Sequence, residues 1–203
     1  MKIICIGRNY LAHVAEMDRE LPKEPLFFMK PATALVGPNQ PFRYPDFSKE
    51  VHFETELVLR IGQTGHAIAE AEASRYYDAI TIGIDFTARD LQRRCIEKGQ
   101  PWEMAKSFDQ SAPVGVFKDF HQLKDPGQIG FGMRLNGQWA QQGDSRDLIF
   151  SFDRLVSHVS RFVTLEAGDL VFTGTPRGVG SVQVGDRLEL FLEGERVSAF
   201  DVI

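Results

Sequence analysis

The alternation of apolar and polar residues predicts a chain built mainly from short strands. Residues 51–61 switch faces at every position, so that Val, Phe, Thr, Leu, Leu and Ile share one face and the other carries His52, Glu54 and Glu56. This pattern is typical of a strand with a core face and a chemical face. Residues 79–84 form an unbroken, β-branched apolar run that ends at Asp85, which predicts a buried strand.

The remaining periodicity predicts further strands and a few helices. Further strands are expected at the opening residues 2–6 and at 26–29, 130–135, 170–173 and 187–192. Helical character is expected at 10–17, with Asn9 as its cap, and at 68–77, 88–98 and 147–162. No repeat or linker composition divides the chain, so we expect one domain over residues 1–203, mainly β with helical decoration.

Composition and charge narrow the class of protein. With 43% hydrophobic and 25% charged residues, the 203-residue chain has the balance of a globular protein, and no apolar run approaches the roughly 20 residues of a membrane span. The net charge of −5 and the scattered Lys and Arg residues argue against nucleic acid, which favours a small-molecule partner. Two cysteines, Cys5 and Cys95, predict no disulfide framework, and a reducing cytoplasm is the expected compartment.

Three carboxylates are the leading candidates for chemistry. Glu54 and Glu56 lie two apart on one strand face, within reach of a single cation. The pair alone fits a solvent-exposed strand face equally well. Asp85 closes a buried run, where an unpaired carboxylate is costly, but it could equally cap a helix beginning at Thr87. An oxygen-only ligand set suits Mg²⁺ or Mn²⁺ better than zinc.

Other candidate residues are weaker when taken alone. His13 and Glu16 are three apart on a predicted helix, where a carboxylate could orient an imidazole base, but such a pair is more often a surface contact. Lys106 follows bulky apolar residues that could desolvate its ammonium group. The simpler interpretation is a surface lysine that buries its stem and keeps its charge in water. The Gly-rich turn at 173–180 lacks a phosphate-loop ending but could bind a carboxylate. Without a nucleophile motif, metal-assisted chemistry is favoured over covalent catalysis.

Six spaced motifs, in order along the chain, resemble the fumarylacetoacetate hydrolase family, and within it the small acylpyruvate hydrolase and oxaloacetate decarboxylase branch. They are Gly7-Arg8-Asn9-Tyr10, His13-x-x-Glu16, His52-x-Glu54-x-Glu56-Leu57, Asp85-x-Thr87-x-Arg89-Asp90-x-Gln92, Gly99-x-Pro101-Trp102-x-x-x-Lys106-Ser107-Phe108 and Thr173-Gly174-Thr175-Pro176-x-Gly178-Val179-Gly180. The resemblance runs from the first strand to near the C-terminus. It implies a mixed β-sandwich-like roll with peripheral helices, usually a homodimer.

The resemblance also implies a role for each matching residue. Glu54, Glu56 and Asp85 would ligate Mg²⁺ or Mn²⁺, and His13 with Glu16 would activate water. Lys106 would hold the substrate and stabilise negative charge. The substrate contacts it implies for a small 2-oxo acid are Arg89, Gln92, Thr175 and, as a weaker candidate, Arg8.

The implied activity is metal-dependent cleavage of the carbon–carbon bond of acylpyruvates, such as fumarylpyruvate or acetylpyruvate, to pyruvate and a carboxylic acid. Decarboxylation of oxaloacetate is a further reaction of the same site, because both pass through a pyruvate enolate. One alternative is an isomerase, tautomerase or hydratase acting on 2-oxo dienoic acids or oxaloacetate. A second is a non-enzymatic, metal-stabilised binding protein, which would not need His13, Glu16 or Lys106.

Overall fold

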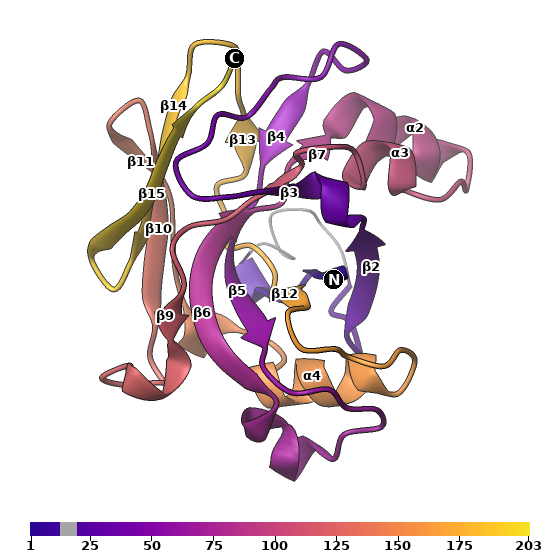
Figure 1. The fold of residues 1–203 in the computed structure, drawn as a ribbon. Helices are drawn as coiled ribbons and strands as arrows, with labels where there is room; N and C mark the ends of the chain where they lie inside the picture. Colours follow the sequence, from indigo (N-terminus) through magenta and orange to yellow (C-terminus); the bar gives the residue numbers. More distant parts are fainter. Residues whose placement is uncertain (13–19) are drawn as a thin grey trace.

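A six-stranded mixed sheet forms the centre of the fold in this computed structural model, which describes residues 1–12 and 20–203 (Figure 1). Its strand order is β2 (Leu26–Lys30), β1 (Ile3–Gly7), β12 (Leu170–Phe172), β5 (Thr55–Ile61), β6 (Tyr77–Ile84) and β9 (Lys118–Asp119). The pair β1 and β12 is parallel and the other neighbours are antiparallel. The predicted strands at the N-terminus, at 26–29 and at 79–84 are therefore confirmed, each within two residues at its ends.

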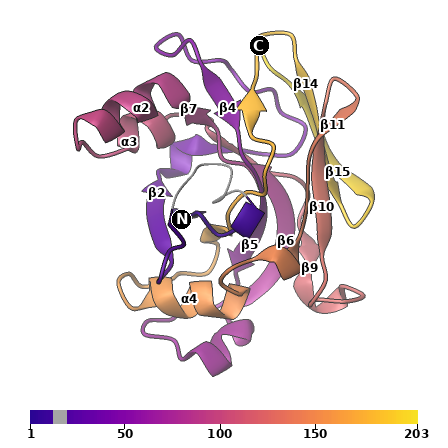
Figure 2. The same ribbon diagram turned by 180° about the vertical axis from the view of Figure 1, so that it is seen from behind.

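A second, antiparallel sheet packs against the first. It consists of β11 (Gln138–Asp144), β10 (Gly130–Leu135), β14 (Arg187–Leu192) and β15 (Glu195–Asp201), in that order. Figure 2 shows this sheet beside β5 and β6 from the reverse side. Leu57 and Ile82 of the first sheet share one hydrophobic cluster with Met133 and Leu190 of the second, so both faces of the central strands are buried. Burial on both faces stabilises strands as rich in β-branched residues as β6.

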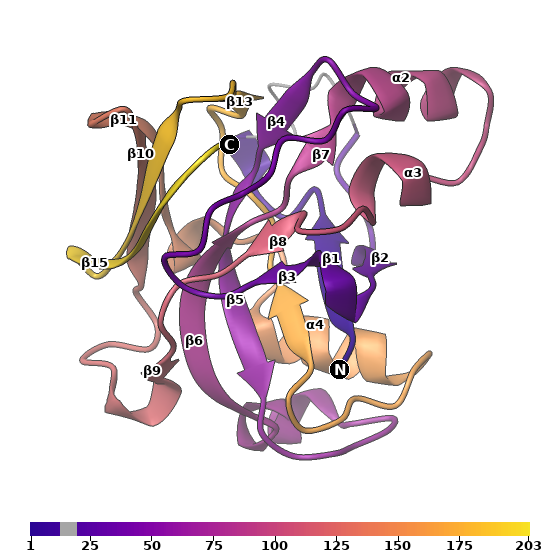
Figure 3. The ribbon, with the colours of Figure 1, turned by 45° about the horizontal axis from the view of Figure 1, so that its top comes forward.

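Two small sheets complete the fold, and Figure 3 shows both of them. One has β4 (Val51–Phe53) between β13 (Gly180–Ser181) and β7 (Thr87–Ala88), and the other pairs β3 (Leu35–Val36) with β8 (Ala112–Pro113). The predicted continuous strand over 51–61 is therefore wrong in one respect. It breaks at Glu54, where the chain leaves the partners of β4 and enters the six-stranded sheet.

The helices are peripheral, and Figure 1 shows α4 at one end of the molecule, with α2 and α3 at the other. The predicted helix at 88–98 is confirmed as α2 (Arg89–Glu97), and it is followed by the short α3 (Glu103–Lys106). The helix expected at 147–162 begins only at Phe152, as α4 (Phe152–Ser160), because Ser151 caps it by accepting a hydrogen bond from the Arg154 N–H.

The helix predicted at 68–77 is wrong in type and in extent. The segment forms only a 3₁₀ helix (Glu70–Arg75), because Tyr77 already belongs to β6 and pairs with Ile61. The helix predicted at 10–17 lies mostly outside the described residues. The side chain of Asn9, its expected cap, bridges other segments: it donates to the carbonyl oxygens of Phe150 and Thr173 and accepts from the Phe150 N–H.

The secondary structure, 20% helical and 38% strand, confirms the α+β, mainly β fold class. Two sheets share the core and the helices cover the ends, as expected for a β-sandwich-like roll with peripheral helices. Within the described part of the chain, we find no helix long and apolar enough to cross a bilayer.

Candidate active site

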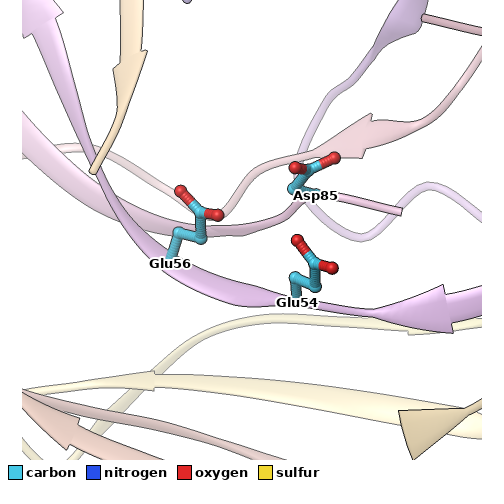
Figure 4. A group of neighbouring side chains, drawn as sticks. All are labelled: Glu54, Glu56 and Asp85. Carbon is cyan, nitrogen blue, oxygen red and sulfur yellow. The ribbon is translucent and has the colours of Figure 1, made fainter. Parts of the chain in front are cut away.

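Strand register brings the three predicted carboxylates together. In the antiparallel pair of β5 and β6, Glu56 lies opposite Gly83, and the Asp85 N–H donates to the Glu54 carbonyl oxygen at 2.8 Å. Asp85 therefore faces Glu54 across the two strands, although 31 positions separate them. Figure 4 shows the side chains of Glu54 and Glu56 on the same side of the chain, near Asp85.

The geometry of this carboxylate triad fits a divalent cation. One oxygen from each of Glu54, Glu56 and Asp85 lies within 4.8 Å of the others, and the three residues are 8%, 1% and 1% exposed. Burial, and next the charge of Asp85, raise the pKa of Glu56 well above its ordinary value. Such crowding is unfavourable unless positive charge lies nearby, and oxygen-only donors are what Mg²⁺ and Mn²⁺ prefer.

The burial of the triad removes two of the simpler interpretations. A solvated strand face is excluded for Glu54 and Glu56, because both are buried. A helix cap is excluded for Asp85, because Thr87 lies in β7 and α2 begins at Arg89 after Ala88, without a side-chain cap. These acids are thus held in the interior by the fold.

Lys106 lies in the middle of the site. Its Nζ donates to Glu54 Oε2 at 2.8 Å and to Asp85 Oδ2 at 2.7 Å, and the residue is only 3% exposed, which excludes a snorkelling surface lysine. Burial alone would lower the pKa of Lys106, but the charges of Asp85 and Glu54 outweigh it and raise the pKa above its ordinary value. The side chain is therefore held as a cation.

A second buried lysine, Lys30 at the end of β2, lies behind Asp85 and was missed by the sequence analysis. Its Nζ is 2.9 Å from Asp85 Oδ1, an ion pair without the alignment of a hydrogen bond. It also donates to Ser111 Oγ at 2.9 Å, to the Phe86 carbonyl oxygen at 3.2 Å and to the carbonyl oxygen of Lys106. Like Asp85, Lys30 closes an apolar strand, and this was a signal that could have found it.

The start of α2 supplies two further predicted residues. Arg89 donates through Nη2 to Glu54 Oε1 and through Nη1 to Gln92 Oε1, both at 2.6 Å. The two residues are one helical turn apart, so that they share the face of α2 that meets the carboxylates. Gln92 is 8% exposed. Arg89 and Gln92 therefore form one polar wall of the site.

The Gly-rich turn after β12 forms another wall. The Gly174 N–H donates to Glu56 Oε2 at 2.7 Å, and Gly174 has a φ of 103°, a conformation that L side chains rarely adopt. A Cβ at this position would also lie 2.7 Å from the Cβ of Asn9. Thr175 follows, 4% exposed, with its hydroxyl oxygen bound by Gln141 Nε2 at 3.0 Å. Gln141 was also missed, because an isolated Gln in a β-strand carries no chemical signal.

One cavity unites the predicted residues that the structure describes. Its polar lining consists of Arg8, Glu54, Glu56, Asp85, Arg89, Gln92, Lys106 and Thr175, and its apolar lining includes Ile6, Leu26, Phe28 and Trp102. Arg8 has a φ of 60°, an uncommon conformation for a residue other than glycine. His13 and Glu16, the predicted water-activating dyad, lie outside the described residues.

Comparisons with known proteins identify relatives over almost the whole chain. The sequence profile of the family described as Fumarylacetoacetate (FAA) hydrolase C-terminal matches residues 2–199. The mitochondrial oxaloacetate tautomerase FAHD1 of Rattus norvegicus is 41% identical over 192 residues, which are 95% of this chain and 87% of that protein. The oxaloacetate tautomerase YcgM of Escherichia coli is 38% identical over 198 residues, 97% of this chain and 90% of that one.

A solved structure is similar over the whole chain. It is a fumarylpyruvate hydrolase from Pseudomonas aeruginosa in complex with Mn²⁺ and pyruvate, with a TM-score of 0.94 and 39% sequence identity. The match covers 100% of this chain and 89% of that one.

Proposed function

This chain belongs to the fumarylacetoacetate hydrolase family, and from that premise we propose that it is an Mg²⁺- or Mn²⁺-dependent enzyme acting on small dianionic 2-oxo acids, with keto–enol tautomerisation of oxaloacetate as its reaction. The observation that carries the proposal is the single cavity in which three buried carboxylates meet a buried, charged lysine. A binding protein stabilised by metal would need only the carboxylates. Lys106 therefore favours the enzyme.

Glu54, Glu56 and Asp85 are the proposed ligands of the cation. When bound, a divalent cation would supply Lewis-acid polarisation of the 2-oxo acid, which acidifies the hydrogens on C3. The described residues would bind and orient the substrate: Arg89 and Thr175 would hold carboxylate oxygens. Gln92 would fix the guanidinium of Arg89.

Lys106 is the proposed electrostatic catalyst. In tautomerisation towards the enol, a base takes the proton from C3, the C2 oxygen gains negative charge, and the conjugate acid of that base returns the proton to this oxygen. The ammonium group of Lys106, held by the carboxylates of Glu54 and Asp85, is already in place when that negative charge develops, so that little reorganisation is needed. The apolar side chains of Phe28 and Trp102 at the cavity wall would limit water near the reacting atoms.

Charge balance favours a dianion as the substrate. Among the described residues that line the cavity, three acids (Glu54, Glu56 and Asp85) face three bases, namely Arg8, Arg89 and Lys106. A divalent cation would therefore leave the cavity with a net positive charge. Oxaloacetate and fumarylpyruvate carry the matching charge, whereas a neutral ketone does not.

Hydrolysis of acylpyruvates is the second candidate function. Its support is the fumarylpyruvate hydrolase structure with Mn²⁺ and pyruvate, at 39% identity to this chain. Tautomerisation ranks first because the relatives with 41% and 38% identity are both oxaloacetate tautomerases. Both reactions use the same enolate stabilisation, and hydrolysis additionally needs an activated water, the role that the family resemblance gives to His13 and Glu16.

The test is an assay of both reactions on one protein preparation. We expect enol-oxaloacetate to convert to the keto form with Mg²⁺ or Mn²⁺, followed by ultraviolet absorbance, and the rate to fall after chelation and recover with metal. Pyruvate release from fumarylpyruvate and acetylpyruvate measures the second candidate. His13→Ala should lower hydrolysis by about 10²- to 10⁴-fold while Mg²⁺ affinity stays near the wild-type value. If metal accelerated none of these reactions, the proposal would fail.

A further inference from the structure

Gln141 reaches from the second sheet to two parts of the active site at once. It lies on β11, is 2% exposed, and its side-chain amide lies between Thr55 and the Gly-rich turn. Gln141 Oε1 accepts a hydrogen bond from the Thr55 N–H at 2.9 Å, and Thr55 stands between the two glutamates of the carboxylate triad. Gln141 Nε2 donates to Thr175 Oγ1 at 3.0 Å and to the Pro176 carbonyl oxygen at 2.9 Å.

The orientation of this amide is determined by its backbone partners. The Thr55 N–H can only donate, so that Oε1 must face it, and the Pro176 carbonyl oxygen can only accept, so that Nε2 must face it. The reversed amide would place donor against donor and acceptor against acceptor in a buried site, where an unsatisfied polar group is unfavourable. Gln141 therefore presents an N–H to Thr175.

This contact determines what the Thr175 hydroxyl can offer to a ligand. A hydroxyl has one proton and two lone pairs, and here one lone pair is occupied by Gln141 Nε2. Among the described residues, the other partner of Thr175 Oγ1 is the Pro176 carbonyl oxygen, which it reaches only at 3.5 Å and which is already bound at 2.9 Å by Gln141. Because Thr175 also lines the cavity, its proton is available to an acceptor there.

We propose that Gln141 is a positioning residue that makes the Thr175 hydroxyl a hydrogen-bond donor towards the carboxylate of an anionic ligand. This inference rests on the proposed function, because it needs a 2-oxo acid or its analogue in the cavity. The same amide binds the backbone between Glu54 and Glu56, so it holds the wall that faces the anion in register with the carboxylate triad. A hydrogen bond to a charged acceptor contributes about 1.5–3 kcal/mol, which is roughly 10- to 100-fold in affinity.

The experiment measures oxalate binding to the Mn²⁺-loaded protein by calorimetry in four backgrounds: wild type, Gln141→Met, Thr175→Val and the double variant. Gln141→Met keeps the side-chain length but removes the polar contacts with Thr175. We expect oxalate affinity to fall about 3- to 10-fold in Gln141→Met and about 10-fold in Thr175→Val, with less than a twofold further loss in the double variant. Mn²⁺ affinity, measured without oxalate, should stay within threefold. Gln142→Met, the same change at the exposed neighbouring position, is the control and should be neutral.

The outcomes separate this inference from the proposed function. If wild-type protein with Mn²⁺ does not bind oxalate, the proposed function fails. A second outcome is that wild-type protein binds oxalate and Thr175→Val weakens this binding. If Gln141→Met then lowers oxalate affinity equally in the wild-type and Thr175→Val proteins, or in neither, only the role of Gln141 is overturned. If Gln141→Met lowered Mn²⁺ affinity as much as oxalate affinity, Gln141 would instead support the carboxylate triad. Should Gln141→Met not fold, Gln141→Glu, which keeps an acceptor for the Thr55 N–H, replaces it in the same cycle.

Discussion

The two sides of Asp85 differ in what their lysines contact. On the cavity side, Lys106 Nζ lies 2.7 Å from Asp85 Oδ2 and belongs to the cavity lining. On the interior side, Lys30 Nζ lies 2.9 Å from Asp85 Oδ1, and its hydrogen bonds go to Ser111 Oγ and two backbone carbonyl oxygens. The same pairing of ammonium and carboxylate thus lines the cavity on one side and binds backbone carbonyl oxygens on the other. The contacts that each lysine makes besides Asp85, rather than the ion pair itself, therefore distinguish the two buried charges.

Asp85→Asn should have the largest effect, because it removes the carboxylate that both sides share. Two buried lysines would lose a counter-charge, and we expect a loss of about 3–5 kcal/mol in the free energy of unfolding together with weaker Mn²⁺ binding. Chemical denaturation and calorimetry measure the two quantities. Stability and Mn²⁺ affinity that both stayed at the wild-type level would contradict the shared role of Asp85.

Lys106→Met should damage the reaction more than the fold. The variant removes a preorganised cation from the cavity, which commonly costs about 10²- to 10³-fold in kcat, while the proposed metal ligands remain. Measurement of kcat, of Mn²⁺ affinity and of the free energy of unfolding separates the effect on the reaction from the effect on the fold. A variant with unchanged kcat would show that Lys106 only balances the charge of the carboxylates.

Lys30→Met should show the reverse pattern. We expect a loss of about 3 kcal/mol in stability, the lower end of the range for breaking a buried pair, because Asp85 keeps Lys106 as a partner. The variant should lose less than about tenfold in kcat, well under the loss for a donor in the cavity. A larger loss of kcat than in Lys106→Met would remove the distinction between the two sides.

Ser111→Ala should give the smallest effect of the series. It removes the hydroxyl that accepts from Lys30 Nζ at 2.9 Å and donates to the Lys106 carbonyl oxygen at 3.1 Å. We expect a loss of about 1–2 kcal/mol in the free energy of unfolding with unchanged kcat, as for one buried hydrogen bond to a charged group. A change in kcat without a change in stability would place Ser111 on the cavity side instead.

The sequence predicted the local part of this picture well. Apolar runs marked β6 and β14 because burial on a sheet requires the same residue types wherever the sheet lies. The motifs pointed to eight polar residues that the structure brings into one cavity. The sequence missed the 3₁₀ type of the helix at 70–75 and the break in the strand at Glu54. Both depend on which strands the neighbouring residues pair with.

Residues whose importance depends on distant partners could not be found from the sequence. Lys30 meets Asp85 across 55 positions, and Gln141 meets Thr55 across 86. Neither distance is encoded in a local period, since it follows from strand order and from the packing of one sheet on another. For the same reason, the sequence could not predict that Asp85 lies between Lys30 and Lys106.

The parallel pairing of β1 with β12 has a consequence for synthesis of the chain. Ile3 to Cys5 pair with Leu170 to Phe172, so β1 is synthesised more than 160 residues before one of its two neighbours. Until then β1 and β5 each lack a partner that β12 supplies, and unpaired apolar edges promote aggregation. Contacts this remote in sequence also slow folding. Assembly of the cavity is therefore a late event, and a nascent chain released before residue 170 would expose the strands that later enclose it.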